Sequence, residues 1–179
     1  MTSTRGKAFF LIFLILFALS STGFAENGAK EDQMDTSRDL FEGFVYYADK
    51  QMTGLKSIIR LFPSALDSHE LAQEILKALI AGPSVSFLEP VWPGETHINS
   101  FFITDDGSAY VDLTLSAKMS DQMDTQSELL AIYSMVNSLT LNIPEIKRVK
   151  ILIQGSDALT LAGHLDLEYF YTSNMMIVK

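Results

Sequence analysis

Residues 98–115 read INSFFITDDGSAYVDLTL, and this stretch decides the fold. It predicts a β-hairpin, because Asp106-Gly107 favours the positive φ angles that a tight turn between two strands requires. After the turn, Val111 and Leu113 alternate with more polar neighbours, which is the period of a half-buried strand. The same alternation predicts that Asp112 faces solvent.

An amphipathic helix is predicted on the N-terminal side of this hairpin, over residues 67–82. Asp67 and Glu70 have the spacing of a capping box, in which each side chain accepts a hydrogen bond from the backbone of the other residue. Gly82 then supplies a residue that readily adopts a left-handed backbone, and Pro83 prevents the helix from continuing. Between these ends, leucine and isoleucine recur at helical spacing.

A second amphipathic helix is predicted after the hairpin, over residues 125–139. Thr125 and Glu128 again have the spacing of a capping box, and the apolar side chains form one continuous face. A further strand is predicted over residues 149–154, where β-branched residues alternate along the chain up to Gly155.

Aromatic and β-branched residues predict a first strand over residues 44–49, and residues 58–62 form another short apolar run that Pro63 stops. The order of elements is thus strand, helix, hairpin, helix, strand. This order predicts an α/β fold of the α+β type: a two-layer sandwich in which two amphipathic helices cover one face of a small mixed sheet.

The first 25 residues have the three parts of a secretory signal peptide. Arg5 and Lys7 form a positive start, residues 8–19 are an unbroken apolar run, and small residues lead up to Ala25. We predict cleavage after Ala25 and an exported protein, periplasmic or otherwise extracytoplasmic. Retention of this segment as an anchor is the alternative, although its apolar run is shorter than the roughly 20 residues that span a bilayer.

Residues 26–39 are polar and charged without apolar periodicity, which predicts a flexible linker before a single domain over residues 40–179. The chain contains no cysteine, which excludes disulfides, thiolate metal sites and cysteine nucleophiles. Its formal net charge is −9, and loss of the two basic residues of the signal would make it −11. Such acidity argues against binding to nucleic acid and to anionic lipid.

The motifs, taken in order over residues 40–168, resemble the GerMN domain family. The matching segments are Lys77–Pro83, Pro93–Thr96, Asp106–Leu113, Glu128–Thr140, Val149–Gly155 and Gly163–Asp166. The resemblance implies an extracytoplasmic α/β domain similar to the ring-building modules of secretion and sporulation machines. It also implies binding and assembly, and no known enzymatic activity. The chain has a single copy of the domain and no cysteine for lipidation, so we carry over a general envelope function and not a sporulation role.

No motif in the sequence predicts a catalytic residue, a cofactor or a metal site. His164 and Asp166 have the spacing of an orienting pair, but no serine-nucleophile motif accompanies them. His69, His97 and His164 are expected at a helix start, in a loop and near the tail, without the spacing that makes metal ligands converge. We interpret all four residues as structural. The aspartates of the hairpin are likewise interpreted as turn and strand residues, because the distal ligands of a calcium loop are missing.

Three aromatic residues are predicted to form an interaction surface: Trp92, Tyr110 and Tyr46. Trp92 lies between Pro90 and Pro93, which would present it on a stiff loop, as interface anchors often are. The alternative is that Trp92 folds back over the core. The one basic cluster, residues 147–150, is interpreted as a solvated strand entrance.

Together these features predict a non-enzymatic envelope protein that mediates protein–protein interaction or assembly. The expected partners are envelope proteins or a second copy of the chain, with membrane contact only through an uncleaved N-terminal segment. The main alternative is an accessory domain that binds cell-wall glycan through its aromatic residues. A hydrolase that uses His164 and Asp166 is the third possibility.

Overall fold

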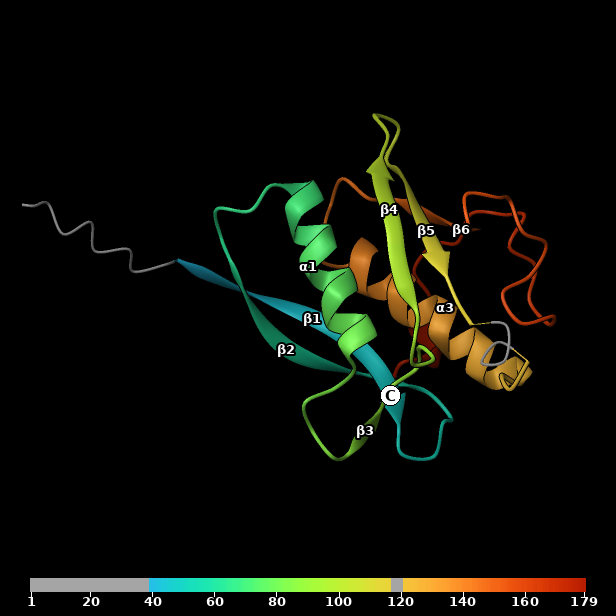
Figure 1. Cartoon of the computed structure of the whole chain (residues 1–179). Helices are drawn as coiled ribbons and strands as arrows, with labels where there is room; N and C mark the ends of the chain where they lie inside the picture. The colour runs from blue at the N-terminus through green and yellow to red at the C-terminus, as the bar shows by residue number, and fades with distance from the viewer. Residues whose placement is uncertain (1–38, 117–120) are drawn as a thin grey trace, which may run out of the picture. The chain divides into compact units, whose positions relative to one another are not determined.

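The strands of the chain form two separate three-stranded sheets (Figure 1). The computed structural model describes residues 39–116 and 121–179. The first sheet is antiparallel, with strand order β2-β1-β3. Its strands are β1 (Leu40–Asp49), β2 (Leu55–Pro63) and β3 (Leu88–Glu89). The predicted first strand and the apolar run that follows it thus pair as a long hairpin.

The second sheet contains the predicted hairpin and is mixed. Strands β4 (His97–Ile103) and β5 (Ser108–Thr114) are antiparallel, and β6 (Arg148–Ile153) lies parallel to β5. Gly107 has a φ of +84° in the turn, as the Asp-Gly signal predicts. A Cβ atom at this position would lie 2.7 Å from the carbonyl oxygen of Glu145, so the turn also brings two backbone segments into close contact.

Helix α1 (Ser68–Ala81) begins and ends as its sequence predicts. Asp67 is the N-cap residue, and both hydrogen bonds of its capping box with Glu70 are present. Gly82 caps the other end with a φ of +79°. Prediction of the second helix, α3 (Thr125–Thr140), was wrong in one detail. Its N-cap is Asp124, whose carboxylate accepts the backbone N–H of Ser127 at 2.7 Å, so no Thr125–Glu128 capping box forms.

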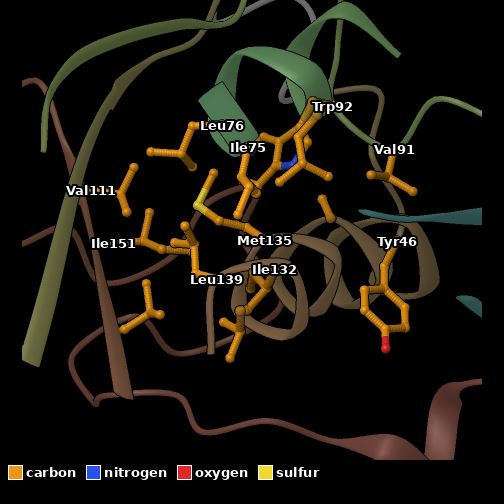
Figure 2. Packing of buried hydrophobic residues seen from close by; sticks show 14 of the residues in the cluster. Tyr46, Ile75, Leu76, Val91, Trp92, Val111, Ile132, Met135, Leu139 and Ile151 are labelled. Atoms are coloured by element: carbon orange, nitrogen blue, oxygen red, sulfur yellow. The ribbon is translucent and has the colours of Figure 1, made fainter. Parts of the chain in front are cut away.

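The core lies where α1 and α3 meet each other and the two sheets. Helix α1 contacts β1 and β4, and α3 contacts β1 and β6. Figure 2 shows Ile75 and Leu76 of α1 gathered with Met135 of α3 and with Val111 and Ile151 of the second sheet. The α+β class is therefore confirmed, whereas the helices pack against two small sheets instead of one face of a single sheet.

Side chains of α3 and its following turn complete one edge of β1. The side-chain oxygen of Asn142 accepts the N–H of Phe44 at 2.8 Å, and its amide group donates to the carbonyl of Phe44 at 2.7 Å. Farther along the strand, the hydroxyl of Ser138 accepts the N–H of Tyr46 at 3.0 Å. Strand β3 pairs with only one end of this edge of β1, and Asn142 and Ser138 cover the part that β3 does not reach. On the other side of β1, β2 is the outermost strand of the sheet.

The C-terminal segment after β6 contacts both sheets through single bridges. Tyr171 bridges antiparallel to Val149, and Val178 bridges parallel to Leu55, on either side of the short 3-10 helix η1 (Met175–Ile177). The predicted signal peptide (1–25), and the predicted linker up to residue 38, lie outside the described residues. Within the described part of the chain, no helix is both long and apolar enough to span a membrane.

Candidate interaction surface

The orienting pair that the spacing of His164 and Asp166 would allow is not formed. The ring nitrogen Nε2 of His164 lies 3.0 Å from the carbonyl oxygen of Met123, across the turn before α3. One carboxylate oxygen of Asp166 accepts the backbone N–H of Glu168 at 2.7 Å. Both side chains therefore hold backbone segments in place, and across residues 39–116 and 121–179 no hydrogen bond joins them.

Glu128 is a buried carboxylate with a role that its sequence position did not suggest. Its side chain is fully buried, and it accepts the backbone N–H groups of Leu161, Ala162 and His164 at 2.9–3.0 Å. A buried carboxylate with three such donors needs no ligand to satisfy it. We therefore assign Glu128 to the attachment of the C-terminal segment to α3.

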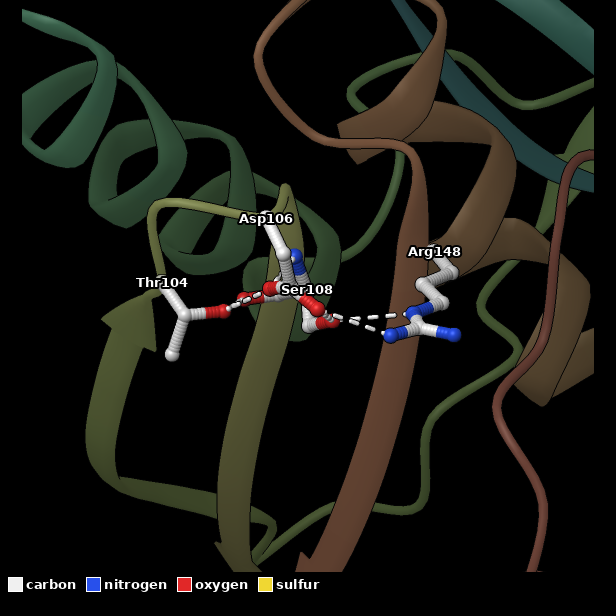
Figure 3. Close-up of polar contacts among 4 residues, drawn as sticks. All are labelled: Thr104, Asp106, Ser108 and Arg148. Carbon is white, nitrogen blue, oxygen red and sulfur yellow. Dashed lines mark hydrogen bonds and ion pairs between the residues drawn. The ribbon is translucent and has the colours of Figure 1, made fainter.

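A polar cluster at the hairpin turn is also occupied by internal contacts (Figure 3). The carboxylate of Asp106 accepts hydrogen bonds from the hydroxyls of Thr104 at 2.6 Å and Ser108 at 3.0 Å. Arg148 donates to it at 2.8 Å and lies over the ring of Phe170, 4.4 Å from its centroid. The hydroxyl of Thr104 first, and then Ser108, hold the pKa of Asp106 well below its usual value. The cluster fastens the turn to β6.

In the basic cluster of Lys147, Arg148 and Lys150, the first two residues are exposed, as a solvated strand entrance requires, whereas Lys150 is buried. Lys150 is 5% exposed, donates to the carbonyl of Leu167 at 2.7 Å and pairs with Asp157 at 2.5 Å. Strand alternation places Lys150 on the opposite face of β6 from the core residues Val149 and Ile151, and the C-terminal segment at Leu167 covers it there. Across the described ranges, no group of three acidic, histidine or cysteine side chains is placed to hold a metal ion.

The aromatic surface predicted from the sequence is not present as such. Trp92 and Tyr46 are 4% and 5% exposed, so neither ring is offered to a partner. Trp92 folds back over the core and lies beside Ile75 (Figure 2), and its neighbour Val91 is also buried. Tyr110 is half-buried and stacks edge-on against Phe170, with centroids 5.5 Å apart. A partner contact through Tyr110 stays a prediction.

An exposed row of apolar side chains lies instead on the β1–β2 hairpin. Phe44 pairs directly with Ile59, and Leu40 and Leu61 lie at even spacings from them on the same two strands. Directly opposed residues of an antiparallel pair share a face, so all four side chains lie on one face. They are 43–57% exposed. We call Leu40, Phe44, Ile59 and Leu61 the apolar strip.

A signal for the apolar strip is present in the sequence of β2. Residues 58–62 are all apolar except Arg60, so apolar side chains occur on both faces of the strand. An edge strand that packs on one face only needs apolar residues at alternate positions. The buried Phe62 and the half-buried Ile58 occupy the packed face, and Ile59 and Leu61 occupy the other. A run of this kind indicates either a fully buried strand or a strand with a binding face.

Another open feature of the surface is a hollow between α1 and β4. It has a volume of about 520 Å³, and its lining includes Lys77, Ile80, His97, Ile98 and Phe101. Lys77 already pairs with Glu74, and the carbonyl of Phe101 is contacted by the ring of His69 at 3.1 Å. Gln73 and Ser100 also line the hollow, and within residues 39–116 and 121–179 no hydrogen bond engages either side chain.

Comparison with protein families gives a match to the family described as Germane: Sporulation and spore germination. The match covers residues 44–158, which is more than half of the chain and includes α1, α3 and both sheets apart from the first residues of β1. No functionally curated protein matches the sequence.

Solved structures of similar fold include proteins from Clostridium perfringens and Bacillus subtilis. A candidate lipoprotein from Clostridium perfringens is 25% identical, with a TM-score of 0.53 over 74% of this chain and 87% of that one. The first GerMN domain of the sporulation protein GerM from Bacillus subtilis is 21% identical, with a TM-score of 0.56 over 74% and 97%. The tandem GerMN domains of the same protein are 19% identical, with a TM-score of 0.60 over 75% and 46%. None of these three is named as an enzyme.

Proposed function

Because this chain belongs to the Germane family, the GerMN-related domains of sporulation and spore germination, we propose that it is an exported, non-enzymatic protein-interaction module of the cell envelope. The observation that carries the proposal is the apolar strip. The four large side chains of the strip are 43–57% exposed and lie on one face of a hairpin. Contiguous apolar surface of this kind is typical of interaction sites. Contact with a partner protein would remove them from water.

Export is supported by the N-terminal pattern of a positive start, an apolar run and small residues before Ala25. It agrees with the similarity to a candidate lipoprotein from Clostridium perfringens. A non-enzymatic role is supported by the internal use of His164, Asp166 and Glu128, each of which holds backbone groups. The glycan-binding alternative loses its main support, because Trp92 is buried.

In-cell crosslinking followed by purification tests the proposal. The wild-type chain is compared with the variant Ile59→Ser and with the matched control Phe102→Ser, which removes an equally exposed apolar side chain from β4 in the other sheet. We expect a discrete envelope complex with the wild type and the control, and at least a tenfold loss of it with Ile59→Ser. The N-terminus is sequenced from the same sample, and a start at Glu26 is expected.

Two outcomes would contradict the proposal. One is a wild-type chain that is exported and folded but crosslinks to no envelope protein. The other is an equal amount of the crosslinked complex with Ile59→Ser and with Phe102→Ser. Thermal melts of both variants establish that each is folded, so that a lost complex is not attributed to unfolding.

A further inference from the structure

One end of the outer edge of β2 is already paired with a segment from outside its hairpin. The backbone N–H of Lys179 donates to the carbonyl of Leu55 at 2.9 Å, and Val178 forms a parallel bridge with the same residue. Asp49 supports this arrangement, because its carboxylate accepts the side-chain ammonium of Lys179 at 3.1 Å. The edge of β2 thus accepts one backbone bridge from another segment of this molecule, at Leu55.

Strand alternation identifies the groups that this edge presents beyond Leu55. The N–H and C=O of a strand residue point to the same side, and those of the next residue point to the other side. Because the carbonyl of Leu55 points outward to Lys179, the backbone groups of Ser57, Ile59 and Leu61 also point outward. In the sheet order β2 is terminal, so these groups line a free edge next to the apolar strip.

The free edge is basic, although the protein as a whole has a net charge of −9. Strand β2 carries Lys56 and Arg60 and no acidic residue. Both are exposed, they lie on the face opposite Ile59, and within residues 39–116 and 121–179 neither forms an ion pair. The nearest acidic residue on the strip face is Glu42, which lies on β1, one strand in from the edge.

A hollow of about 300 Å³ adjoins Arg60 on this basic face, between the end of β2 and α1. Its lining includes Pro63, Ala81 and the ion pair of Lys77 with Glu74, so Arg60 is the basic side chain of the hollow that is left without an ion pair within the described residues. An acidic side chain from a strand added beside β2 would point toward Arg60 at the mouth of this hollow. Carboxylate and guanidinium groups form strong charge-assisted hydrogen bonds, so the hollow fits an acidic residue.

We propose that the outer edge of β2 binds an extended segment of a partner protein, with apolar side chains over Ile59 and Leu61 and acidic side chains opposite Lys56 and Arg60. The segment continues the sheet by main-chain hydrogen bonds to Ser57, Ile59 and Leu61. This inference rests on the proposed function and adds to it the mode of binding and the chemistry of the partner.

A second copy of the chain fits the edge less well than an acidic segment does. Pairing of β2 with β2 would bring Lys56 and Arg60 of both copies to one seam, and β2 supplies no carboxylate to offset them. Like charges at such a seam are destabilising. Charge complementarity therefore selects a partner strand that alternates apolar residues with aspartate or glutamate.

Fluorescence anisotropy with labelled synthetic peptides tests the partner chemistry. The probe is a peptide of four glutamate–valine repeats, and its control has lysine in place of glutamate. We expect the glutamate peptide to bind the wild-type chain at least tenfold more tightly than the lysine peptide does. Added salt should weaken binding of the glutamate peptide. The variant Arg60→Glu should bind the glutamate peptide no more tightly than the lysine peptide. Equal affinity of the two peptides for the wild-type chain would overturn the proposal.

A pair of variants tests the main-chain hydrogen bonds. Ser57→Pro removes an outward N–H, and proline is tolerated at such a position because that N–H does not bond β1. Its control, Ser57→Ala, keeps the N–H. We expect Ser57→Pro to weaken peptide binding at least fivefold and Ser57→Ala to leave it unchanged. Hydrogen exchange gives a second readout: bound peptide should slow exchange of the Ser57, Ile59 and Leu61 amides. Unchanged exchange at all three would overturn strand addition.

The same variants separate this inference from the proposed function. If Ile59→Ser abolishes the envelope complex while Arg60→Glu and Ser57→Pro leave it intact, the chain binds through its apolar strip and strand addition is wrong. If no variant affects any envelope complex, the proposed function itself fails. A concentration-dependent dimer in sedimentation that Ile59→Ser abolishes would assign the edge to a second copy and overturn the acidic-partner inference.

Discussion

Glu128 accepts the backbone N–H of His164 at 3.0 Å, so the first turn of α3 holds a segment 36 residues farther along the chain. Its other carboxylate oxygen accepts the N–H groups of Leu161 and Ala162 at 3.0 and 2.9 Å. The C-terminal segment runs on from this attachment to Val178 beside β2. One buried side chain thus connects the second helix to the path of the tail.

Replacement of Glu128 by alanine should lower the free energy of unfolding strongly. Three N–H groups would lose their acceptor, and each buried unsatisfied donor costs about 1–3 kcal/mol, so we expect a loss of at least about 3 kcal/mol. Urea denaturation measures it. Glu74→Ala is the control, because Glu74 makes an exposed ion pair worth less than about 1 kcal/mol. Equal stabilities of the two variants would show that the buried contacts contribute nothing.

Asp49, at the end of β1, should make stability depend on pH in the acid range. Hydrogen bonds from Thr53, first from its backbone N–H, and from Lys179 lower the pKa of Asp49 from 3.8 to about 2, against the opposing effect of burial. A carboxyl with a lowered pKa in the folded state stabilises the fold fully above its unfolded pKa. That contribution is lost as pH falls from 3.8 through about 2.

Thermal melts between pH 5 and pH 2 test this dependence against the variant Asp49→Asn. We expect the wild type to be more stable at pH 5 and the difference in Tm to shrink steadily toward pH 2. Asp105→Asn, in the exposed hairpin turn, is the control and should melt like the wild type throughout. A difference between wild type and Asp49→Asn that stays constant with pH would contradict the assignment.

Local signals in the sequence predicted the elements that depend on local chemistry. Asp67 and Gly82 bound α1 because a capping carboxylate and a left-handed glycine act within one turn of the chain. The Asp106-Gly107 pair placed the hairpin turn for the same reason. The family resemblance is confirmed, since the matched region covers residues 44–158.

Contacts between distant segments account for what sequence patterns did not show. Asp112 is 9% exposed instead of facing solvent, because it accepts the N–H of Gly155 at 2.7 Å. Glu128 looked like a capping residue, although its partners lie more than 30 residues away. Asn142 covers one edge of β1 through Phe44, which is 98 residues away in the sequence, and β2 is left as the open edge of the sheet. Periodicity reports which residues share a face, not what covers that face.

Trp92 should behave as a buried tryptophan without a hydrogen bond. It is 4% exposed, and its indole N–H has no acceptor within the described ranges. As the single tryptophan of the chain, it should give blue-shifted emission that acrylamide quenches poorly. Trp92→Phe removes an unpaired hydrogen-bond donor together with some packing contacts. We therefore expect the free energy of unfolding to fall by about 1 kcal/mol or less. Red-shifted, readily quenched emission would place the ring in water and restore it as an interaction anchor.

Gly107 should tolerate a side chain less well than Gly155, although both have positive φ. Alanine at either position adopts a left-handed backbone at a cost of roughly 1–2 kcal/mol. At Gly107, with φ of +84°, the added Cβ would also lie 2.7 Å from the carbonyl of Glu145 and crowd Lys147. At Gly155, with φ of +72°, nothing lies within 4 Å. Overpacking adds about 1–3 kcal/mol, so Gly107→Ala should be the more destabilised by that amount in urea denaturation. If the two variants were equally stable, the hairpin turn would have room to move away from the loop before β6, and the Asp106–Arg148 cluster would not hold it there.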